Sequence, residues 1–115
     1  MSFWRNIFGG ASEDAEPVAP VNLENAVRKA GRAEGRVQGV GFRFFVQSNA
    51  KNFGITGWVK NMSDGSVTME LQGTAQIIEQ LIEKIKRGND WIKVTNFESS
   101  DLPVVKGEDK FAIRY

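Results

Sequence analysis

Residues 35–43, with the sequence Gly-Arg-Val-Gln-Gly-Val-Gly-Phe-Arg, combine residue types that could bind one small anion. Gly39 and Gly41 lack Cβ atoms, so their backbone can approach a ligand closely and can adopt positive φ angles. A helix that begins near Phe42 would add unpaired N–H groups and the positive end of its dipole. Arg43 would offer a planar set of donors to the same oxygens. The segment therefore predicts a site for a small phosphate.

Composition limits the chemistry that can surround this segment. The chain has 115 residues, enough for one domain with its own core. It contains no cysteine and no histidine, which excludes a disulfide framework, a cysteine nucleophile and the commonest general base and metal ligand. No apolar run is long enough to span a bilayer, and the N-terminus lacks the apolar centre of a secretory signal. We expect a cytoplasmic protein, since a reducing compartment suits a chain without cysteine.

Charge is unevenly distributed, although the formal net charge is only +1. The first 26 residues are acidic, because they contain Glu13, Asp14, Glu16 and Glu24 but only one basic residue, Arg5. The remainder is therefore mildly basic. This balance suits an anionic ligand but falls well short of the basic surface of a nucleic-acid-binding domain.

The first 26 residues differ in composition from the rest. Residues 9–20 are small, acidic and interrupted by prolines, which is typical of a disordered linker. Residues 1–8 place four apolar side chains on one face of a short helix: Phe3, Trp4, Ile7 and Phe8. This segment has two interpretations, an interfacial anchor or docking peptide and a loose tail. We expect residues 1–26 to be a disordered or weakly structured extension of a domain at residues 27–115.

From residue 27 onward the apolar periodicity alternates between strand and helix. Strands are expected at residues 27–37, 55–61, 66–72, 91–97 and 110–114. The first helix has a stripe formed by Phe42, Phe45, Val46, Ala50 and Phe53 and is stopped by Gly54, and the second has one formed by Ile77, Ile78, Leu81, Ile82 and Ile85. The order βαββαβ predicts an α+β, ferredoxin-like split sandwich, in which two helices cover one face of an antiparallel sheet. We expect both stripes, together with Trp58 and Trp91, to pack in the core.

Three segments together resemble the acylphosphatase family. They are residues 35–43, the run Gly-Trp-Val-Lys-Asn at 57–61 followed by Asp-Gly-Ser-Val at 64–67, and the run Phe-Ala-Ile-Arg-Tyr at 111–115. The resemblance implies hydrolysis of a carboxyl-phosphate anhydride to a carboxylate and inorganic phosphate, with no metal and no other cofactor. By motif position, Arg43 matches the phosphate-binding arginine and Asn61 the water-orienting asparagine. The family's backbone phosphate cradle maps onto Gln38, Gly39, Val40, Gly41 and Phe42.

The chemistry of these residues is consistent with that activity. An acyl phosphate already has a good leaving group, so positioning and charge stabilisation can supply most of the rate enhancement. Asn61 can orient a water molecule but cannot remove its proton at neutral pH. An oxygen of the substrate would therefore take the proton, which makes the expected reaction substrate-assisted hydrolysis.

Other interpretations are open at this point. Arg43 could be a solvated side chain, Asn61 could simply open a hairpin turn, and the glycines could form a tight connection. A module that binds acyl or carbamoyl phosphate without turnover is the main alternative function. RNA binding fits less well, because the expected strand at 66–72 lacks the aromatic residues on which bases stack. We expect a monomer whose partners are a small acyl phosphate and inorganic phosphate, with no nucleic acid.

Overall fold

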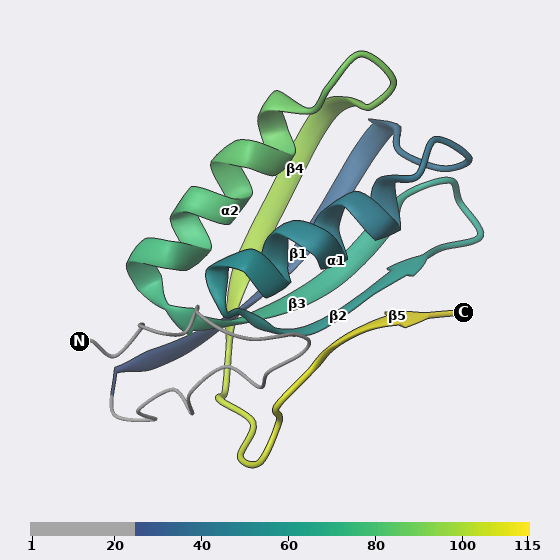
Figure 1. Cartoon of the computed structure of the whole chain (residues 1–115). Helices are drawn as coiled ribbons and strands as arrows, with labels where there is room; N and C mark the ends of the chain where they lie inside the picture. The colour runs from purple at the N-terminus through teal and green to yellow at the C-terminus, as the bar shows by residue number, and fades with distance from the viewer. Residues whose placement is uncertain (1–24) are drawn as a thin grey trace.

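The computed structural model describes residues 25–115 as an α+β domain (Figure 1). The elements are β1 (Ala26–Arg36), α1 (Phe42–Phe53), β2 (Thr56–Asn61), β3 (Val67–Thr74), α2 (Ala75–Arg87), β4 (Lys93–Leu102) and β5 (Phe111–Arg114). Both helices lie on the same face of the sheet (Figure 1), and the loop between β4 and β5 packs on part of the opposite face. The predicted ferredoxin-like arrangement is confirmed, and the full order is βαββαββ, because β5 follows the predicted βαββαβ series.

The five strands form one sheet with the order β4-β1-β3-β2-β5. The pairs β1–β3, β1–β4 and β2–β3 are antiparallel, whereas β2–β5 is parallel. The expectation of a fully antiparallel sheet was therefore wrong at this edge, and the sheet is mixed. The reason is topological: the loop after β4 turns the chain back beneath the sheet, so β5 enters at the end where β2 begins (Figure 1).

The two helices bury the stripes that their sequence spacing predicts. In α1, Phe42, Val46 and Ala50 are buried, and Phe45 and Phe53 pack partly against the same core. In α2 the buried residues are Ile78, Leu81, Ile82 and Ile85, with Ile77 at the margin. Gly54 ends α1 in the left-handed conformation, as its position predicts. This packing fixes α1 on the sheet and so fixes where its first turn points.

Trp58 and Trp91 do not lie together in the core. Trp58 is half-buried in β2, and the guanidinium of Arg114 lies 4.7 Å from the centre of its ring. Trp91 is 68% exposed and precedes β4, so its predicted packing role was wrong. The cause is local, because the side-chain oxygen of Asn89 accepts hydrogen bonds from the N–H groups of Trp91 and Ile92, both at 2.8 Å. This turn delays the start of the strand.

A buried cluster around Arg28 in β1 lies where the β4–β5 loop packs against the sheet. Arg28 is only 3% exposed, and its guanidinium bonds Glu70 at 2.8 Å, Gln72 at 2.9 Å and Glu108 at 2.8 and 3.2 Å. Burial lowers the pKa of Arg28, but its bonds to Glu108 and Glu70 outweigh that effect and raise it overall. Nothing in the sequence pattern singled out this arginine.

Two further expectations concern the membrane and the N-terminus. Among the helices of residues 25–115, none is long and apolar enough to cross a membrane. The segment with Phe3, Trp4, Ile7 and Phe8 lies outside the described residues, so its two interpretations stay predictions.

Candidate active site

A pocket of about 270 Å³ lies where the β1–α1 loop, the end of β2 and the C-terminal strand β5 meet. All three segments lie at the same end of the molecule, on the right of Figure 1. The walls of the pocket include Gly39, Gly41, Arg43 and Asn61. The fold therefore brings together the two halves of the site that the sequence predicts.

The β1–α1 loop owes its shape to two glycines in the left-handed region. Gly39 has a φ of 75° and Gly41 a φ of 77°. A Cβ built on either residue would meet no other atom within 4 Å. The glycines are thus required by backbone conformation rather than by crowding, and the space beside them stays open to a ligand.

Within residues 25–115, the N–H groups of this loop and of the first residue of α1 are unpaired. Helix α1 begins at Phe42, and its N-cap Gly41 provides no side-chain cap. Within residues 25–115, the N–H groups of Gln38, Gly39, Val40, Gly41 and Phe42 donate to no protein acceptor. Such a run of donors next to the positive end of a helix dipole favours an anion.

Arg43 lies beside these donors and is held by neutral groups of residues 25–115. Its Nη1 donates to the carbonyl oxygen of Arg114 at 3.3 Å, and its guanidinium lies 4.8 Å from the centre of the Tyr115 ring. Within residues 25–115 no carboxylate comes within ion-pair distance of Arg43. A cation in the first turn of a helix is electrostatically unfavourable on its own. Arg43 is therefore oriented by neutral groups and keeps its charge available to an anion.

Asn61 is the last residue of β2 and pairs with Val67 of β3. Its side-chain oxygen Oδ1 is enclosed and has no hydrogen-bond partner in the described part of the chain. Leaving a buried acceptor unpaired costs about 1–3 kcal/mol, so this oxygen favours a partner from outside the described residues. The turn after β2 is shaped by another side chain, since Asp64 accepts from the N–H of Ser66 at 2.9 Å. Because Asp64 shapes this turn, Asn61 is not needed merely to form it.

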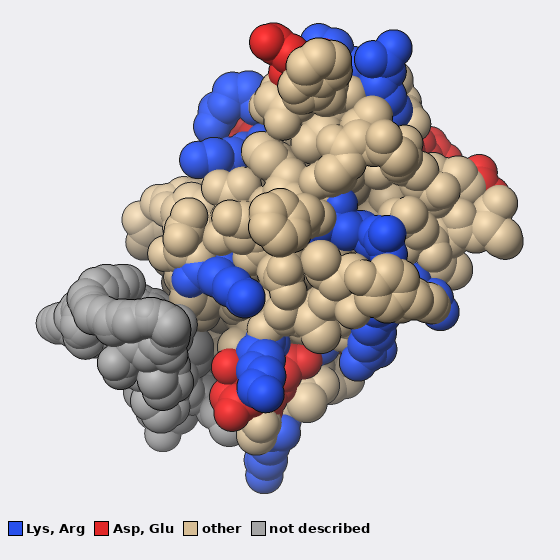
Figure 2. Space-filling view, turned by 45° about the vertical axis from the view of Figure 1, so that its right-hand side comes forward, with Lys and Arg blue, Asp and Glu red and all other residues tan. Residues whose placement is uncertain are grey.

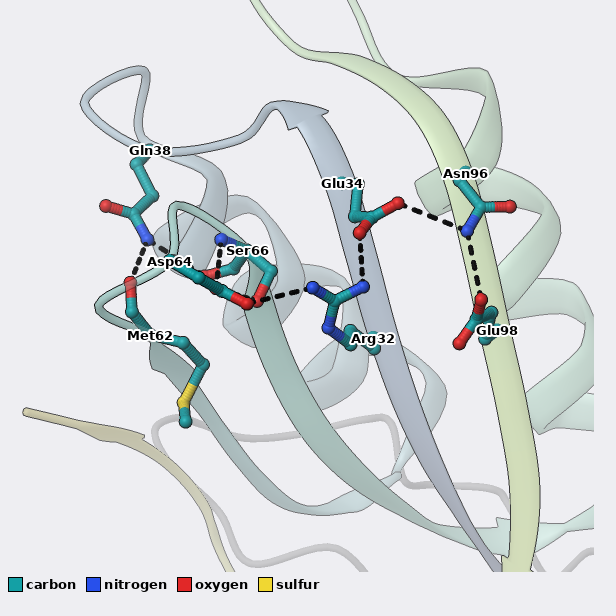
Figure 3. A network of polar contacts seen from close by, with 8 residues as sticks. All are labelled: Arg32, Glu34, Gln38, Met62, Asp64, Ser66, Asn96 and Glu98. Atoms are coloured by element: carbon teal, nitrogen blue, oxygen red, sulfur yellow. Dashed lines mark hydrogen bonds and ion pairs between the residues drawn. The ribbon is translucent and has the colours of Figure 1, made fainter.

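A polar network links the loop, the turn and the sheet (Figure 3). The side chain of Gln38 reaches the turn, where its Nε2 donates to the carbonyl oxygens of Met62 and Ser66, both at 2.8 Å. Arg32 of β1 pairs with Asp64 at 2.9 Å and with Glu34. The hydroxyl and N–H of Ser66, followed by Arg32, lower the pKa of Asp64, so this carboxyl stays ionised.

The surface around the site has little negative charge. Figure 2 shows basic side chains spread over the face that includes this end of the molecule, while acidic side chains gather in a few places. Near the centre of the view, a basic side chain lies in a hollow between uncharged residues. This distribution favours the approach of an anionic ligand.

Comparisons with known proteins agree with this geometry. A family model described as Acylphosphatase matches residues 29–113. The chain belongs to the acylphosphatase family. It is 43% identical to an acylphosphatase from Clostridium beijerinckii over 89 residues, which cover 77% of this chain and 99% of that protein.

Solved structures place the acylphosphatase fold in two settings. The crystal structure of acylphosphatase from Bacillus subtilis has 36% sequence identity and a TM-score of 0.73, and the match covers 77% of this chain and 99% of that one. Full-length HypF has 30% identity and a TM-score of 0.71, but the match covers only 12% of its chain. A domain of this fold thus occurs both as nearly a whole protein and as a small part of a larger one.

Sequence reasoning missed several residues of this acylphosphatase site. It assigned no role to Tyr115 or to Phe44, which both line the pocket, although Phe44 is 67% exposed. Tyr115 belonged to a recognised terminal run, but its position against Arg43 depends on the parallel pairing of β5. The side chain of Gln38 was also missed, because only its backbone was expected to contribute.

Proposed function

We propose that this chain hydrolyses small acyl phosphates, with Arg43 and the β1–α1 loop binding the phosphoryl group and Asn61 orienting the attacking water. The backbone N–H groups in this proposal are those of Gln38, Gly39, Val40, Gly41 and Phe42. The observation that carries the proposal is that Asn61, whose enclosed Oδ1 has no partner within residues 25–115, lines the same pocket as Arg43, which no carboxylate of those residues neutralises. One group can hold a water molecule while the other holds an anion.

In the proposed mechanism the oxygen of the water forms a new bond to phosphorus while the bond from phosphorus to the acyl oxygen breaks. The carboxylate leaves with the electron pair of that bond, and a phosphate oxygen takes the proton of the water. Arg43 and the loop N–H groups stabilise the charge on the phosphoryl oxygens in the transition state. Asn61 accepts a hydrogen bond from the water and fixes its direction of attack.

The test compares the wild type with Asn61→Ala, using acetyl phosphate as substrate and inorganic phosphate as a competitive inhibitor. We expect kcat to fall about 100-fold, while the inhibition constant for phosphate changes by less than about threefold. Asn52→Ala serves as the control, because Asn52 is an exposed asparagine of α1. Unchanged turnover in Asn61→Ala would contradict the role proposed for this side chain.

The second candidate is a module that binds acyl or carbamoyl phosphate without hydrolysing it. The observation that favours it is the likeness to a small part of HypF, whose structure is described as phosphate- and nucleotide-bound. Tight phosphate binding by a wild-type protein that releases no phosphate from acetyl phosphate would support this candidate over hydrolysis.

We further propose that the protein acts as a monomer in the cytoplasm. All the groups of the proposed mechanism come from one chain, since Arg43, Asn61 and the loop line a single pocket. The absence of cysteine from the sequence suits a reducing compartment. Sedimentation at the concentration used for kinetics tests the monomer, and cell fractionation tests the compartment.

A further inference from the structure

The side chain of Gln38 spans two segments that the proposed mechanism uses separately. Gln38 lies in the β1–α1 loop, which offers N–H groups to the phosphate. Its Nε2 nevertheless donates to the carbonyl oxygens of Met62 and Ser66, each at 2.8 Å (Figure 3). These two residues flank the turn between β2 and β3, and the N–H of Met62 also donates to the carbonyl oxygen of Ser66 at 2.9 Å. One amide group thus fastens the loop to both sides of the turn.

The fastened turn begins directly after Asn61. Met62, whose carbonyl oxygen accepts from Gln38, is the next residue in the chain, so a shift of this peptide would move the backbone that carries the Asn61 side chain. Asn61 has no side-chain hydrogen bond of its own through Oδ1 within residues 25–115. The position of its Oδ1 relative to the phosphate loop therefore depends on how the backbone around it is held.

The turn is also held from the side of the sheet. Asp64 accepts from the hydroxyl of Ser66 at 2.6 Å and from its N–H at 2.9 Å, and its other oxygen pairs with Arg32 of β1 at 2.9 Å. Beyond Arg32 the contacts continue through Glu34 to Asn96 of β4 (Figure 3). The turn is thus braced on the sheet, and Gln38 connects this braced turn to the phosphate loop.

We infer that Gln38 is a positioning residue, whose side chain sets the distance between the water held by Asn61 and the phosphoryl group held by the loop. This inference rests on the proposed function. The reacting oxygen and phosphorus must meet in line, and a misplacement of about 1 Å can cost about 100-fold in rate. The side chain of Gln38 acts on the reaction through Asn61. Its backbone N–H has a different role in the proposed mechanism, because it helps to bind the phosphoryl group.

The test is a double-mutant cycle between Gln38→Met and Asn61→Ala. Methionine has nearly the length of glutamine but cannot donate the two hydrogen bonds. We expect Gln38→Met to lower kcat about tenfold in the wild-type background, with less than a threefold change in the inhibition constant for inorganic phosphate. In the Asn61→Ala background the same change should lower kcat by less than about twofold, since the group that it positions is already gone.

Two further variants separate positioning from folding. Gln47→Met is the matched control, because Gln47 also donates from Nε2 to a backbone carbonyl, that of Phe111 at 3.0 Å, but does not touch the turn. It should leave kcat within about twofold of the wild type. Gln38→Glu keeps the shape of glutamine and places a carboxylate against two carbonyl oxygens, so its kcat should fall at least as far as that of Gln38→Met.

The outcomes that overturn the inference are distinct. An equal loss of kcat from Gln38→Met in both backgrounds would show that Gln38 does not act through Asn61. A parallel loss of phosphate affinity would assign its side chain to the phosphate cradle alone. If Asn61→Ala is slow but Gln38→Met is as active as the wild type, only the positioning role fails. If Asn61→Ala is fully active, the proposed mechanism fails, and the positioning role fails with it.

Discussion

Two arginines of this domain, Arg28 and Arg43, differ in what surrounds their charge. Arg28 is buried and bonds two carboxylates and the side-chain oxygen of Gln72. Arg43 is held by a carbonyl oxygen and an aromatic ring, with no carboxylate partner within residues 25–115. The fold has paired the first guanidinium with two carboxylates and has oriented the second without neutralising it. An arginine positioned by neutral groups is suited to bind an anion from outside the chain.

The same difference extends to the loops beside the two arginines. The loop that carries Glu108 contributes its carboxylate to Arg28, and Val105 of that loop exchanges two hydrogen bonds with Gln72, at 2.8 and 2.9 Å. The loop before Arg43 instead leaves the N–H groups of residues 38–42 unpaired within the described protein. One end of the domain uses its polar groups for stability, and the other keeps them for a ligand.

The largest expected effect comes from Arg43→Ala. It should lower kcat/KM for acetyl phosphate at least about 1000-fold and weaken phosphate inhibition, while the free energy of unfolding changes by less than about 1 kcal/mol. Steady-state kinetics and urea unfolding measure the two quantities. Arg36→Ala is the control for net charge, because Arg36 is an exposed residue at the end of β1. Equal losses of kcat/KM in the two variants would show that Arg43 contributes only a general electrostatic attraction for the anionic substrate.

Arg28→Met should have the opposite effect: it should lower stability and leave activity nearly unchanged. Removing one partner from a buried ion pair leaves Glu70 and Glu108 without their counterion, and the free energy of unfolding should fall by about 3 kcal/mol. Turnover of the folded variant should stay close to that of the wild type. A change in kcat measured well below the midpoint of thermal unfolding would show that the Arg28 cluster is coupled to the pocket that contains Arg43. The proposed separation between a stabilising arginine and a ligand-binding arginine would then be wrong.

Two glycines with the same backbone conformation allow a closely matched comparison, with smaller expected effects than those of the arginine variants. Gly41 and Gly107 have φ angles of 77° and 78°, and a Cβ built on either meets no atom within 4 Å. Replacing either glycine with alanine should cost about 1 kcal/mol of stability, because the left-handed conformation disfavours a side chain. Only Gly41→Ala should also weaken inhibition by inorganic phosphate, since only Gly41 lines the pocket. Equal phosphate inhibition in both variants would remove Gly41 from the proposed cradle.

The smallest expected effect concerns the acid stability contributed by Asp64. Its pKa is lowered in the folded state, so it contributes stability above the ordinary carboxyl pKa of about 4 and loses that contribution as the pH falls further. Asp64→Asn should therefore be less stable than the wild type at pH 7, and the difference should shrink steadily from pH 5 to pH 2. Urea unfolding across this range measures it, with the exposed Asp90→Asn as control. A difference that is constant with pH would show that the charge of Asp64 has no such role.

Local pattern was sufficient to predict most of the fold. The stripes that contain Phe42 and Ile78 both became buried helix faces, because a helix must turn its apolar side toward the sheet. The pattern also placed a strand at the residues that became β5, but it did not give its direction. That direction follows from where the loop after β4 turns, which depends on packing between distant segments.

The parts of the site that could be predicted are those whose residues lie close together in the sequence. The glycine loop and Arg43 stand within nine consecutive residues, so their arrangement could be predicted from propensity and helix electrostatics. The contacts of Gln38 with Met62 and of Arg32 with Asp64 could not, because these partners lie 24 and 32 positions away along the chain. Arg28 is the extreme case, since its burial depends on Glu108, 80 positions away.

The strand order also has a consequence for how the domain folds and opens. Of the four strand pairs, only β2–β3 joins neighbours through a short turn, and the others require the closure of long loops. The turn after Asn61 can therefore form early, whereas the contact between Arg43 and the carbonyl oxygen of Arg114 spans 71 positions and forms only when β5 docks. Detachment of this four-residue edge strand would release Arg43 while the rest of the sheet stayed paired. Heat or denaturant should then abolish phosphate binding before the sheet unfolds.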